Sequence, residues 1–491
     1  MYSGAGFNDW EIGDITIYLH NGEYHLFHLI IPNHDYIAHA VSKDGLTWRR
    51  TKNAIFVGDP GEWDDDMLWT MHVFSRDKKF FMYYSGLQRV DKGINSRIGL
   101  AASDDLLHWN KVKGAGLPIE IKRGFYECLD DNPRGWLSFR DPFYFEHEGN
   151  AYILFCGRKN FGPLSRRGCV GLLKLEGDSY VLQESLIYPM VYDDVECPCA
   201  FELDGRFYII GSIREDVKVR YWVSDRFVGE YKSFHSDVLL PQGNYAARIL
   251  KDGNHLLIYN FFFTYGAIDS LRVLPPPKEL STDTQGRLVL KSFYRWEQMA
   301  KDKIVQPDFG TPVMLLKNTT ASFEKKDDQW ICSSGSGYEI FYFDQPSDNF
   351  IWEGRIRNTG LGKFGLVAHI DQESNGYFIS FDLIEGLIQL RSWGYNPANN
   401  RKNFIFSNVQ SNVCIVPPTG TFQFKLICYG NYIELSVDGE VKLTLMDYTW
   451  SGPGMGLYTA SSTIILDQSL IRTLPHVVNE YASQEVAQKN M

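Results

Sequence analysis

Three carboxylic acids open strand-like segments at corresponding points of the chain. Asp14 begins the first such segment, Asp141 lies between an arginine and a proline, and Glu196 precedes a cysteine and a proline. When carboxylates converge, crowding and poor solvation raise the pKa of one of them, which then stays protonated as a general acid. Retaining cleavage of a glycosidic bond needs such an acid together with a carboxylate nucleophile. The three acids therefore indicate glycosidase chemistry.

The three acids belong to a repeated unit of the order strand, strand, turn, strand. Copies of the second strand begin near residues 21, 79, 150, 205 and 253. Because a single unit cannot bury both of its faces, we expect the five copies to stack radially into a five-bladed β-propeller. The innermost strand of each blade starts at the central channel. We therefore expect Asp14, Asp141 and Glu196 to converge on the mouth of that channel.

A different pattern follows the three prolines at 275–277. Segments of alternating polar and apolar residues lie between glycine and asparagine turns, at 350–356, 377–382, 422–427 and 432–437. Such alternation is typical of a two-sheet sandwich. We expect an all-β chain, with a five-bladed β-propeller over 1–300, a linker over 301–317, a C-terminal β-sandwich over 318–475 and a polar tail over 476–491.

Composition narrows the choice of partner. A net charge of −11 argues against nucleic acid and against an anionic membrane, and it suits a small carbohydrate substrate. The eight cysteines show no metal-ligand spacing, so we expect no metal and no organic cofactor. Without a leader or an apolar span, a cytoplasmic monomer or homodimer is expected, although a secreted chain with its signal removed has the same pattern.

Two motifs resemble a known family. Arg140-Asp141-Pro142 and Glu196-Cys197-Pro198, in this order and before a sandwich domain, are similar to those of glycoside hydrolase family 32, the invertases, fructanases and inulinases. The resemblance implies that Asp141 stabilises the transition state and that Glu196 is the acid/base. It also implies that Arg140 contacts substrate hydroxyls.

The nucleophile motif of that family is not intact in this chain. Asp9 matches the motif locally because it follows an asparagine. The number of residues between the acid and the next strand, which follows Gly22, favours Asp14 instead. We favour Asp14 as the nucleophile and retain Asp9 as a substrate-binding candidate. His28 replaces a glutamine of the family, and Trp69 and Thr70 correspond loosely to its Trp-Ser-Gly-Ser stretch. All three are predicted to contact substrate.

The fifth repeat adds Tyr245 as a pocket residue, with Arg248 nearby. Long loops that include 64–66, 125–136 and 160–167 predict a narrow pocket and removal of terminal units. We expect a retaining hydrolase of terminal β-fructofuranosyl units in sucrose, fructans or short fructosyl oligosaccharides. A fructosyltransferase with the same covalent intermediate and a non-catalytic carbohydrate-binding propeller are the alternatives.

Overall fold

The computed structural model describes residues 2, 11–114, 116–131, 134–177, 179–263, 272–305, 310–360, 362–395, 403–417 and 419–476. Asp9 and all of the expected tail except His476 lie outside these ranges. Within them the chain is almost entirely β, with one helix, α1 (Arg295–Met299), and the short 3-10 turns η1 (Arg89–Asp91), η2 (Leu129–Asp131) and η3 (Leu164–Arg166). None of the described helices has the length and apolarity to cross a membrane.

The described part of the N-terminal half forms five antiparallel sheets, one for each sequence repeat. Blade 1 holds β1 (Glu11–His20), β2 (Glu23–Ile31), β3 (Tyr36–Ser42), β4 (Arg49–Arg50) and β5 (Ile55–Phe56), and blade 2 holds β6 (Met67–Arg76), β7 (Lys79–Leu87), β8 (Ser96–Ser103) and β9 (Trp109–Lys111). Blade 3 holds β10 (Arg140–His147), β11 (Asn150–Arg158), β12 (Gly168–Glu176) and β13 (Ser179–Ile187). Blade 4 holds β14 (Glu196–Leu203), β15 (Arg206–Ile213), β16 (Lys218–Ser224) and β17 (Val238–Leu240), and blade 5 holds β18 (Asn244–Asp252), β19 (His255–Phe263), β20 (Arg272–Val273), β21 (Lys278–Thr282) and β22 (Leu288–Ser292).

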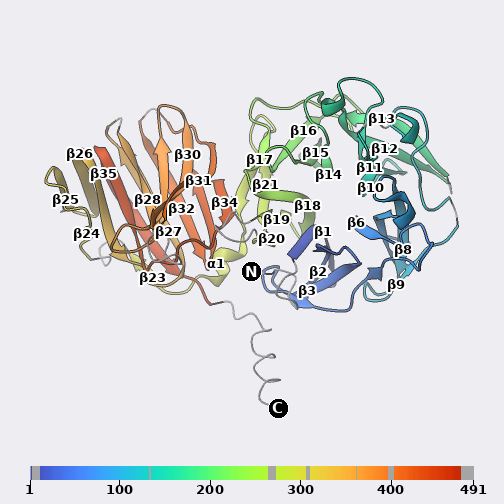
Figure 1. Cartoon of the computed structure of the whole chain (residues 1–491). Coiled ribbons are helices and arrows are strands. Elements are labelled where there is room, and N and C mark those ends of the chain that lie inside the picture. The colour runs from blue at the N-terminus through green and yellow to red at the C-terminus, as the bar shows by residue number, and fades with distance from the viewer. Residues whose placement is uncertain are drawn as a thin grey trace, which may run out of the picture.

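The five sheets are arranged around a central axis as a β-propeller, which confirms the predicted fold (Figure 1). The first strands of successive blades contact one another, and β18 of the last blade returns to β1. Apolar side chains fill the space between neighbouring sheets, for example around Leu68 and Met82 and around Ile153 and Phe155. Because each blade buries its faces against two neighbours, the strands combine β-branched and aromatic residues on both sides.

All five innermost strands carry an irregularity at the same point. The register with the second strand shifts between Ile12 and Ile15, Trp69 and Met71, Arg140 and Phe143, Glu196 and Cys199, and Tyr245 and Arg248. A β-bulge bends the strand and redirects a side chain, and bulges concentrate beside active sites. In this chain the bulges contain or adjoin all three predicted catalytic acids.

The C-terminal strands form one continuous hydrogen-bonded sheet that folds into a sandwich (Figure 1). Its order is β31-β30-β29-β28-β35-β27-β32-β33-β34, with β23, β24, β25 and β26 joined at β35 and β26. These strands are β23 (Lys303–Val305), β24 (Val313–Met314), β25 (Ala321–Lys326), β26 (Gln329–Asp344), β27 (Asn349–Asn358), β28 (Lys363–Ile370), β29 (Gly376–Asp382), β30 (Leu387–Tyr395), β31 (Phe404–Val413), β32 (Thr421–Tyr429), β33 (Tyr432–Val437), β34 (Glu440–Met446) and β35 (Gly454–Thr473).

One long strand explains how a single sheet makes two layers. Residues 454–460 of β35 pair with β28, and residues 464–473 of the same strand pair with β27. The strand turns between these segments at Ser461, whose φ is 54°. β35 therefore passes from one layer of the sandwich to the other.

The sandwich lies directly against the propeller. Asn244 of β18 donates to the Thr444 carbonyl of β34 at 3.1 Å, and Gln410 donates to the Gln242 carbonyl at 2.6 Å. Trp296 of α1 is fully buried, with its ring 5.0 Å from that of Tyr429. In the segment expected to link the domains, β23 and β24 pair with the sandwich strands β35 and β26.

Candidate active site

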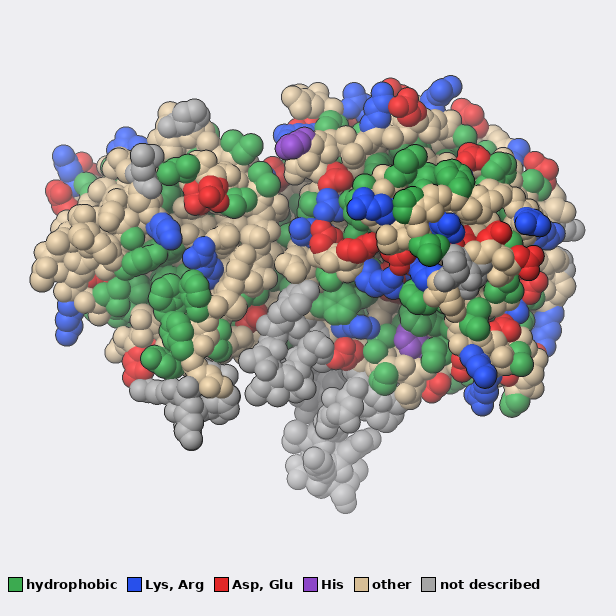
Figure 2. Space-filling model, turned by 45° about the horizontal axis from the view of Figure 1, so that its top comes forward, with side chains coloured by type: hydrophobic (Ala, Val, Ile, Leu, Met, Phe, Trp, Pro, Cys, Tyr) green, Lys and Arg blue, Asp and Glu red, His purple; other side chains and the backbone are tan. Residues whose placement is uncertain are grey.

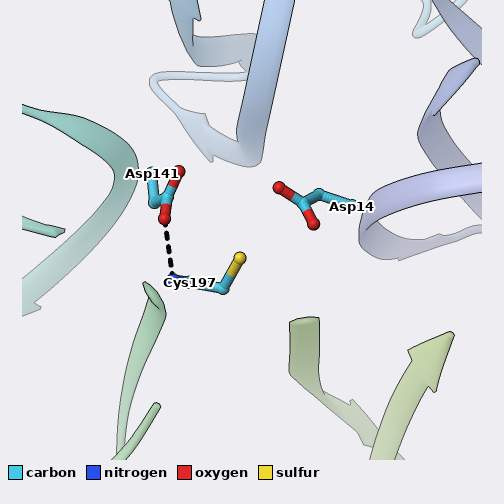
Figure 3. A group of neighbouring side chains, drawn as sticks. All are labelled: Asp14, Asp141 and Cys197. Carbon is cyan, nitrogen blue, oxygen red and sulfur yellow. Dashed lines mark hydrogen bonds between the residues drawn. The ribbon is translucent and has the colours of Figure 1, made fainter. Parts of the chain in front are cut away.

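The bulges bring Asp14, Asp141 and Cys197 together from three different blades (Figure 3). One carboxylate oxygen of each aspartate and the Cys197 sulfur all lie within 4.8 Å of one another. Asp141 and Cys197 have φ values of 61° and 51°, in the left-handed region that residues with a side chain seldom adopt. Such backbone strain persists where surrounding structure enforces it, and it is common at functional sites.

Asp14 is oriented by the neighbouring blade. The hydroxyl of Thr70, in the bulge of β6, donates a hydrogen bond to Asp14 Oδ2. Thr70 is fully buried, whereas Asp14 is partly exposed. The Thr70 hydroxyl therefore fixes the orientation of the Asp14 carboxylate at the mouth.

Hydrogen bonds hold Asp141 at both its main-chain N–H and its carboxylate. Its own N–H donates to Ser85 Oγ at 3.0 Å, and its Oδ2 accepts from the N–H of Cys197 at 2.9 Å. The residue is 2% exposed. These bonds leave the Asp141 carboxylate few alternative positions.

Glu196 receives donors at both of its oxygens. Arg140 Nη2 donates to Oε1 at 2.6 Å, and the hydroxyl of Tyr245 donates to Oε2. A second guanidinium lies farther out, with Arg214 Nη1 3.9 Å from Oε1. Glu196 is thus positioned from blades 3, 4 and 5 at once.

A second carboxylate competes for Arg140. Asp194 accepts from the same Nη2 atom at 2.9 Å, from Ser138 Oγ at 2.9 Å and from Arg134 at 3.3 Å. The carboxylate of Asp194 is buried, and its backbone packs so closely on Gly168 that a Cβ there would lie 2.7 Å from the Asp194 Cα. Arg140 is therefore anchored by an ion pair that lies beside the one it makes with Glu196.

The electrostatic setting divides these acids into two kinds. Burial raises the pKa of Asp14, of Asp141 and of Glu196, and the charge of a neighbouring carboxylate raises each of them further. Burial also acts on Asp194, but Arg140, Arg134 and its hydrogen bonds outweigh it and lower the pKa of that carboxyl. Asp194 is therefore the fixed anion of the group, while the raised pKa values of the three acids at the mouth favour a proton shared among them, with the others ionised.

The sequence of this propeller matches a family model. Residues 14–255 match the glycosyl hydrolases family 32 N-terminal domain. The propeller is a family 32 glycosyl hydrolase domain. No curated protein sequence matches the chain.

Solved structures share the whole two-domain architecture. An exo-inulinase from Aspergillus awamori has a TM-score of 0.68 at 15% identity, with 95% of this chain and 96% of that chain covered. A sucrose-6-phosphate hydrolase from Lactobacillus gasseri has a TM-score of 0.67 at 14% identity, with 95% and 91% covered. Fructan 1-exohydrolase IIa from Cichorium intybus has a TM-score of 0.67 at 13% identity, with 95% and 96% covered. The likeness shows that the shared fold extends through the C-terminal sandwich. The match of the propeller to the family 32 glycosyl hydrolase model identifies the protein as a glycosidase.

The residues predicted to contact substrate surround the acids of the family 32 domain at different points. Tyr245 and Arg140 lie at Glu196, and Thr70 lies at Asp14. Trp69 is partly exposed beside them and stacks on His34 with the ring centres 4.4 Å apart. Asp9 lies outside the described residues.

His28 is placed differently from the prediction. It is 0% exposed, and its ring bonds to the Tyr2 hydroxyl and to the Leu29 carbonyl at 2.8 Å each. With no exposed surface the side chain has no path to a substrate. Burial also lowers its pKa to about 3, so His28 stays neutral and acts in packing.

The family 32 domain contains site residues that the sequence did not single out. Ser85 and Ser138 bind the backbone of Asp141 and the carboxylate of Asp194, and Arg134 and Arg214 lie at the rim. Arg248 is buried beneath the acids and donates to the Cys197 carbonyl at 2.7 Å. Arg248 differs from the other four because it had already been named from the sequence, beside Tyr245 at the start of the fifth repeat.

The group of Asp14, Asp141 and Cys197 also has the composition of a cation site. However, burial raises the pKa of the Cys197 thiol well above its usual range, so the sulfur is protonated unless a metal displaces the proton. One oxygen of each carboxylate already accepts a hydrogen bond from the protein. These contacts are better suited to carboxylate catalysis than to a ligand set for a resident metal.

Proposed function

We propose that the protein is a retaining β-fructofuranosidase that removes the terminal fructosyl unit of sucrose, fructans or short fructosyl oligosaccharides. Asp14 is the nucleophile, Glu196 is the acid/base, and Asp141 stabilises the transition state. The observation that carries this proposal is the pair of restrained acids: Asp14 held by Thr70, and Glu196 held by Arg140 and Tyr245.

In the first step Asp14 attacks the anomeric carbon while Glu196 gives its proton to the glycosidic oxygen. The bond between the anomeric carbon and that oxygen breaks, a bond to Asp14 forms, and the leaving group departs as an alcohol. Burial raises the pKa of Glu196, which supports its role as the proton donor. In the second step Glu196 takes a proton from water, and the resulting nucleophile releases the sugar from Asp14.

Asp141 has a separate role in this scheme. Its carboxylate is tied to the Cys197 N–H and lies near Asp14, so it is positioned to bind sugar hydroxyls and to favour the positive charge of the oxocarbenium-like transition state. Burial and the neighbouring Asp14 raise the pKa of Asp141. Its protonation in the free enzyme therefore depends on the state of Asp14.

The substrate class is supported by the similar structures and by the rim. The names of the three similar structures refer to inulin, sucrose 6-phosphate and fructan. At the rim, the buried Glu127 binds Arg158 at 2.8 Å and Arg167 at 3.0 Å, which joins the loops before β10 and before β12. Loops held together in this way favour a preformed pocket for a chain end.

Product analysis tests the proposal. The enzyme is incubated with sucrose, 1-kestose, long inulin and levan, and products are followed by chromatography from the earliest times. We expect fructose from the start, with the initial anomer retained by NMR. Early oligosaccharides of intermediate length would contradict removal of terminal units, and products longer than the substrate would identify a transferase. Inversion of the anomeric centre would exclude Asp14 as a covalent nucleophile.

A further inference from the structure

Arg248 is a buried cation that bonds to no carboxylate among the described residues. Figure 2 shows acidic and basic side chains intermixed on the face of the propeller that it draws, whereas Arg248 is 1% exposed and lies inside the molecule. Both of its hydrogen bonds come from Nη1 and go to backbone carbonyls, and its Nε and Nη2 have no hydrogen-bond partner in the described part of the chain. The Phe143 ring centre lies 5.9 Å from its guanidinium carbon. A buried charge without an ion pair costs stability, and such groups concentrate at functional sites.

The Nη1 atom of Arg248 joins blade 5 to blade 4. It donates to the Cys197 carbonyl at 2.7 Å and to the carbonyl of its own neighbour Ala247 at 3.2 Å. Cys197 lies in the bulge of β14 with a φ of 51°, although Pro198 follows it and a residue before proline prefers extended backbone. The bond from Arg248 therefore holds a carbonyl at a residue whose own preference is for a different conformation.

The N–H of the same Cys197 binds the carboxylate that the proposed function assigns to the transition state. It donates to Asp141 Oδ2 at 2.9 Å. Because only φ and ψ of Cys197 relate its N–H to its carbonyl, a change at the carbonyl also moves the N–H. Glu196 is joined to Cys197 by the peptide that carries this N–H, so the same movement reaches the acid/base.

We infer that Arg248 is a positioning residue that holds the Cys197 carbonyl and thereby keeps the Cys197 N–H in place to bind Asp141. This inference rests on the proposed function, in which Asp141 stabilises the transition state. At 1% exposure Arg248 has almost no surface that a substrate could reach. Because it acts through Cys197, its loss should affect the transition state more than the binding of substrate.

The charge of Arg248 has a second effect, on Asp14. Burial raises the pKa of Asp14, and among the charged groups around it Glu196 raises that pKa further while Arg248 lowers it. Asp141 lies beside Asp14 as a second like charge, and the Cys197 thiol is protonated because burial raises its pKa well above the usual range. Arg248 thus favours the ionised carboxylate that a nucleophile needs.

His72 does not add a competing charge to this effect. It is buried, and burial followed by the charge of Arg248 lowers its pKa well below the usual range, so the imidazole is neutral. Its Nδ1 accepts from the N–H of Tyr144 at 2.9 Å, which is consistent with a neutral ring.

Two substitutions separate the hydrogen bond of Arg248 from its charge. Arg248→Met removes both, and we expect kcat on sucrose to fall on the order of 100-fold with KM changed less than about threefold. The low-pH limb of kcat/KM should move to higher pH, because Asp14 loses a neighbouring cation, and the high-pH limb should stay in place. Arg248→Lys keeps the charge, so the low-pH limb should stay near that of the wild type while kcat falls about tenfold. Arg226→Met is the control, because Arg226 is exposed on blade 4 and should match the wild type.

The same two substitutions in an Asp141→Asn background test whether Arg248 acts through Asp141. With kcat measured at the pH optimum of each variant, either substitution should lower it by less than about threefold, because the group that it positions is already impaired. A general loosening of the fold would give the same factor in both backgrounds and would overturn the positioning role. Arg248→Lys decides this comparison where Arg248→Met does not fold.

Crystal structures of the variants test the inference without an activity measurement. In Arg248→Met, Cys197 should leave the left-handed region, and the distance from its nitrogen to Asp141 Oδ2 should exceed that of a hydrogen bond. An unchanged Cys197 and Asp141 would overturn the inference. Wild-type enzyme inactive on every fructofuranoside would overturn the proposed function, whereas the crystal structures would still decide whether Arg248 holds Cys197.

Discussion

The hydroxyl of Tyr245, in blade 5, donates a hydrogen bond to the carboxylate of Glu196, in blade 4. Tyr245 is 7% exposed and follows the start of β18, where the inner strand bulges. A donor of this kind favours the ionised carboxylate and so opposes the burial that raises the pKa of Glu196. The pKa of Glu196 therefore depends on a donor from blade 5 as well as on its burial in blade 4.

Tyr245→Phe removes this donor. The pKa of Glu196 should rise further, and because Glu196 acts as an acid in the first step, the high-pH limb of kcat/KM should move to higher pH. The loss of kcat at the optimum should be no more than about 100-fold, since the carboxyl itself remains. A pH–rate profile checks this expectation, and a limb that moves to lower pH would contradict it.

Asp194→Asn should move the same limb in the opposite direction. The negative charge of Asp194 raises the pKa of Glu196, and Asp194 also shares the Arg140 Nη2 atom with it. Without that charge Arg140 acts on Glu196 alone, so the pKa of Glu196 falls and the acid form is lost at lower pH. Asp225→Asn is the control, because the Asp225 side chain is 93% exposed and lies away from the mouth. An unchanged profile for Asp194→Asn would show that Asp194 has only a structural role.

Asp14→Asn should abolish turnover, with a loss on the order of 10⁴-fold, because an amide cannot attack the anomeric carbon. Asp9→Asn should retain most of the activity. The measurement is kcat on sucrose for both variants. The reverse result, with Asp9→Asn inactive and Asp14→Asn active, would assign the nucleophile to Asp9.

Asp14→Asn should also stabilise the fold at neutral pH. Burial raises the folded-state pKa of Asp14, so the protonated form is favoured in the native protein and stability is lost as the pH rises through that pKa. An asparagine avoids this loss. We expect a higher melting temperature than wild type at pH 7 and no difference at a pH below the unfolded-state pKa. A lower melting temperature at pH 7 would contradict the assigned direction.

Trp296→Ala tests the contact between the two domains. The ring is fully buried between the last blade and the sandwich, and truncation should cost about 3–5 kcal/mol of unfolding free energy. Differential scanning calorimetry should show a lower melting temperature and separate transitions for the two domains. A single transition at the wild-type temperature would show that the contact contributes little to stability.

The sequence allowed the fold and the convergence of Asp14, Asp141 and Glu196 to be predicted because repeat position decides both. A blade repeats its strand order, so acids in the same register share a location in space. The bulges at Asp141 and Cys197 left no such signal, since a shift of register is not visible in one strand alone.

The loop over 125–136 was expected at the rim, but the side-chain contacts there were not predictable, for a different reason. Arg134, Trp136 and Arg214 come from connections between strands, where no hydrophobic period fixes the direction of a side chain. His28 was assigned wrongly to substrate contact for a related reason. It corresponds to a polar position of the family, and that correspondence gives no indication that its side chain is fully buried. Contacts of this kind depend on how blades meet and not on the residues of one strand.

In each inner strand the residues at the bulge face the channel mouth, and the residues beyond it build the sheet. Beyond each bulge the ladder resumes its regular pairing, so the blade is specified by residues other than those at the mouth. Five positions then face one another across the axis, and each is open to exchange without rebuilding the sheet that carries it. A propeller of this kind can diverge in specificity through changes at the bulges, while the regular pairing beyond them keeps the blade intact.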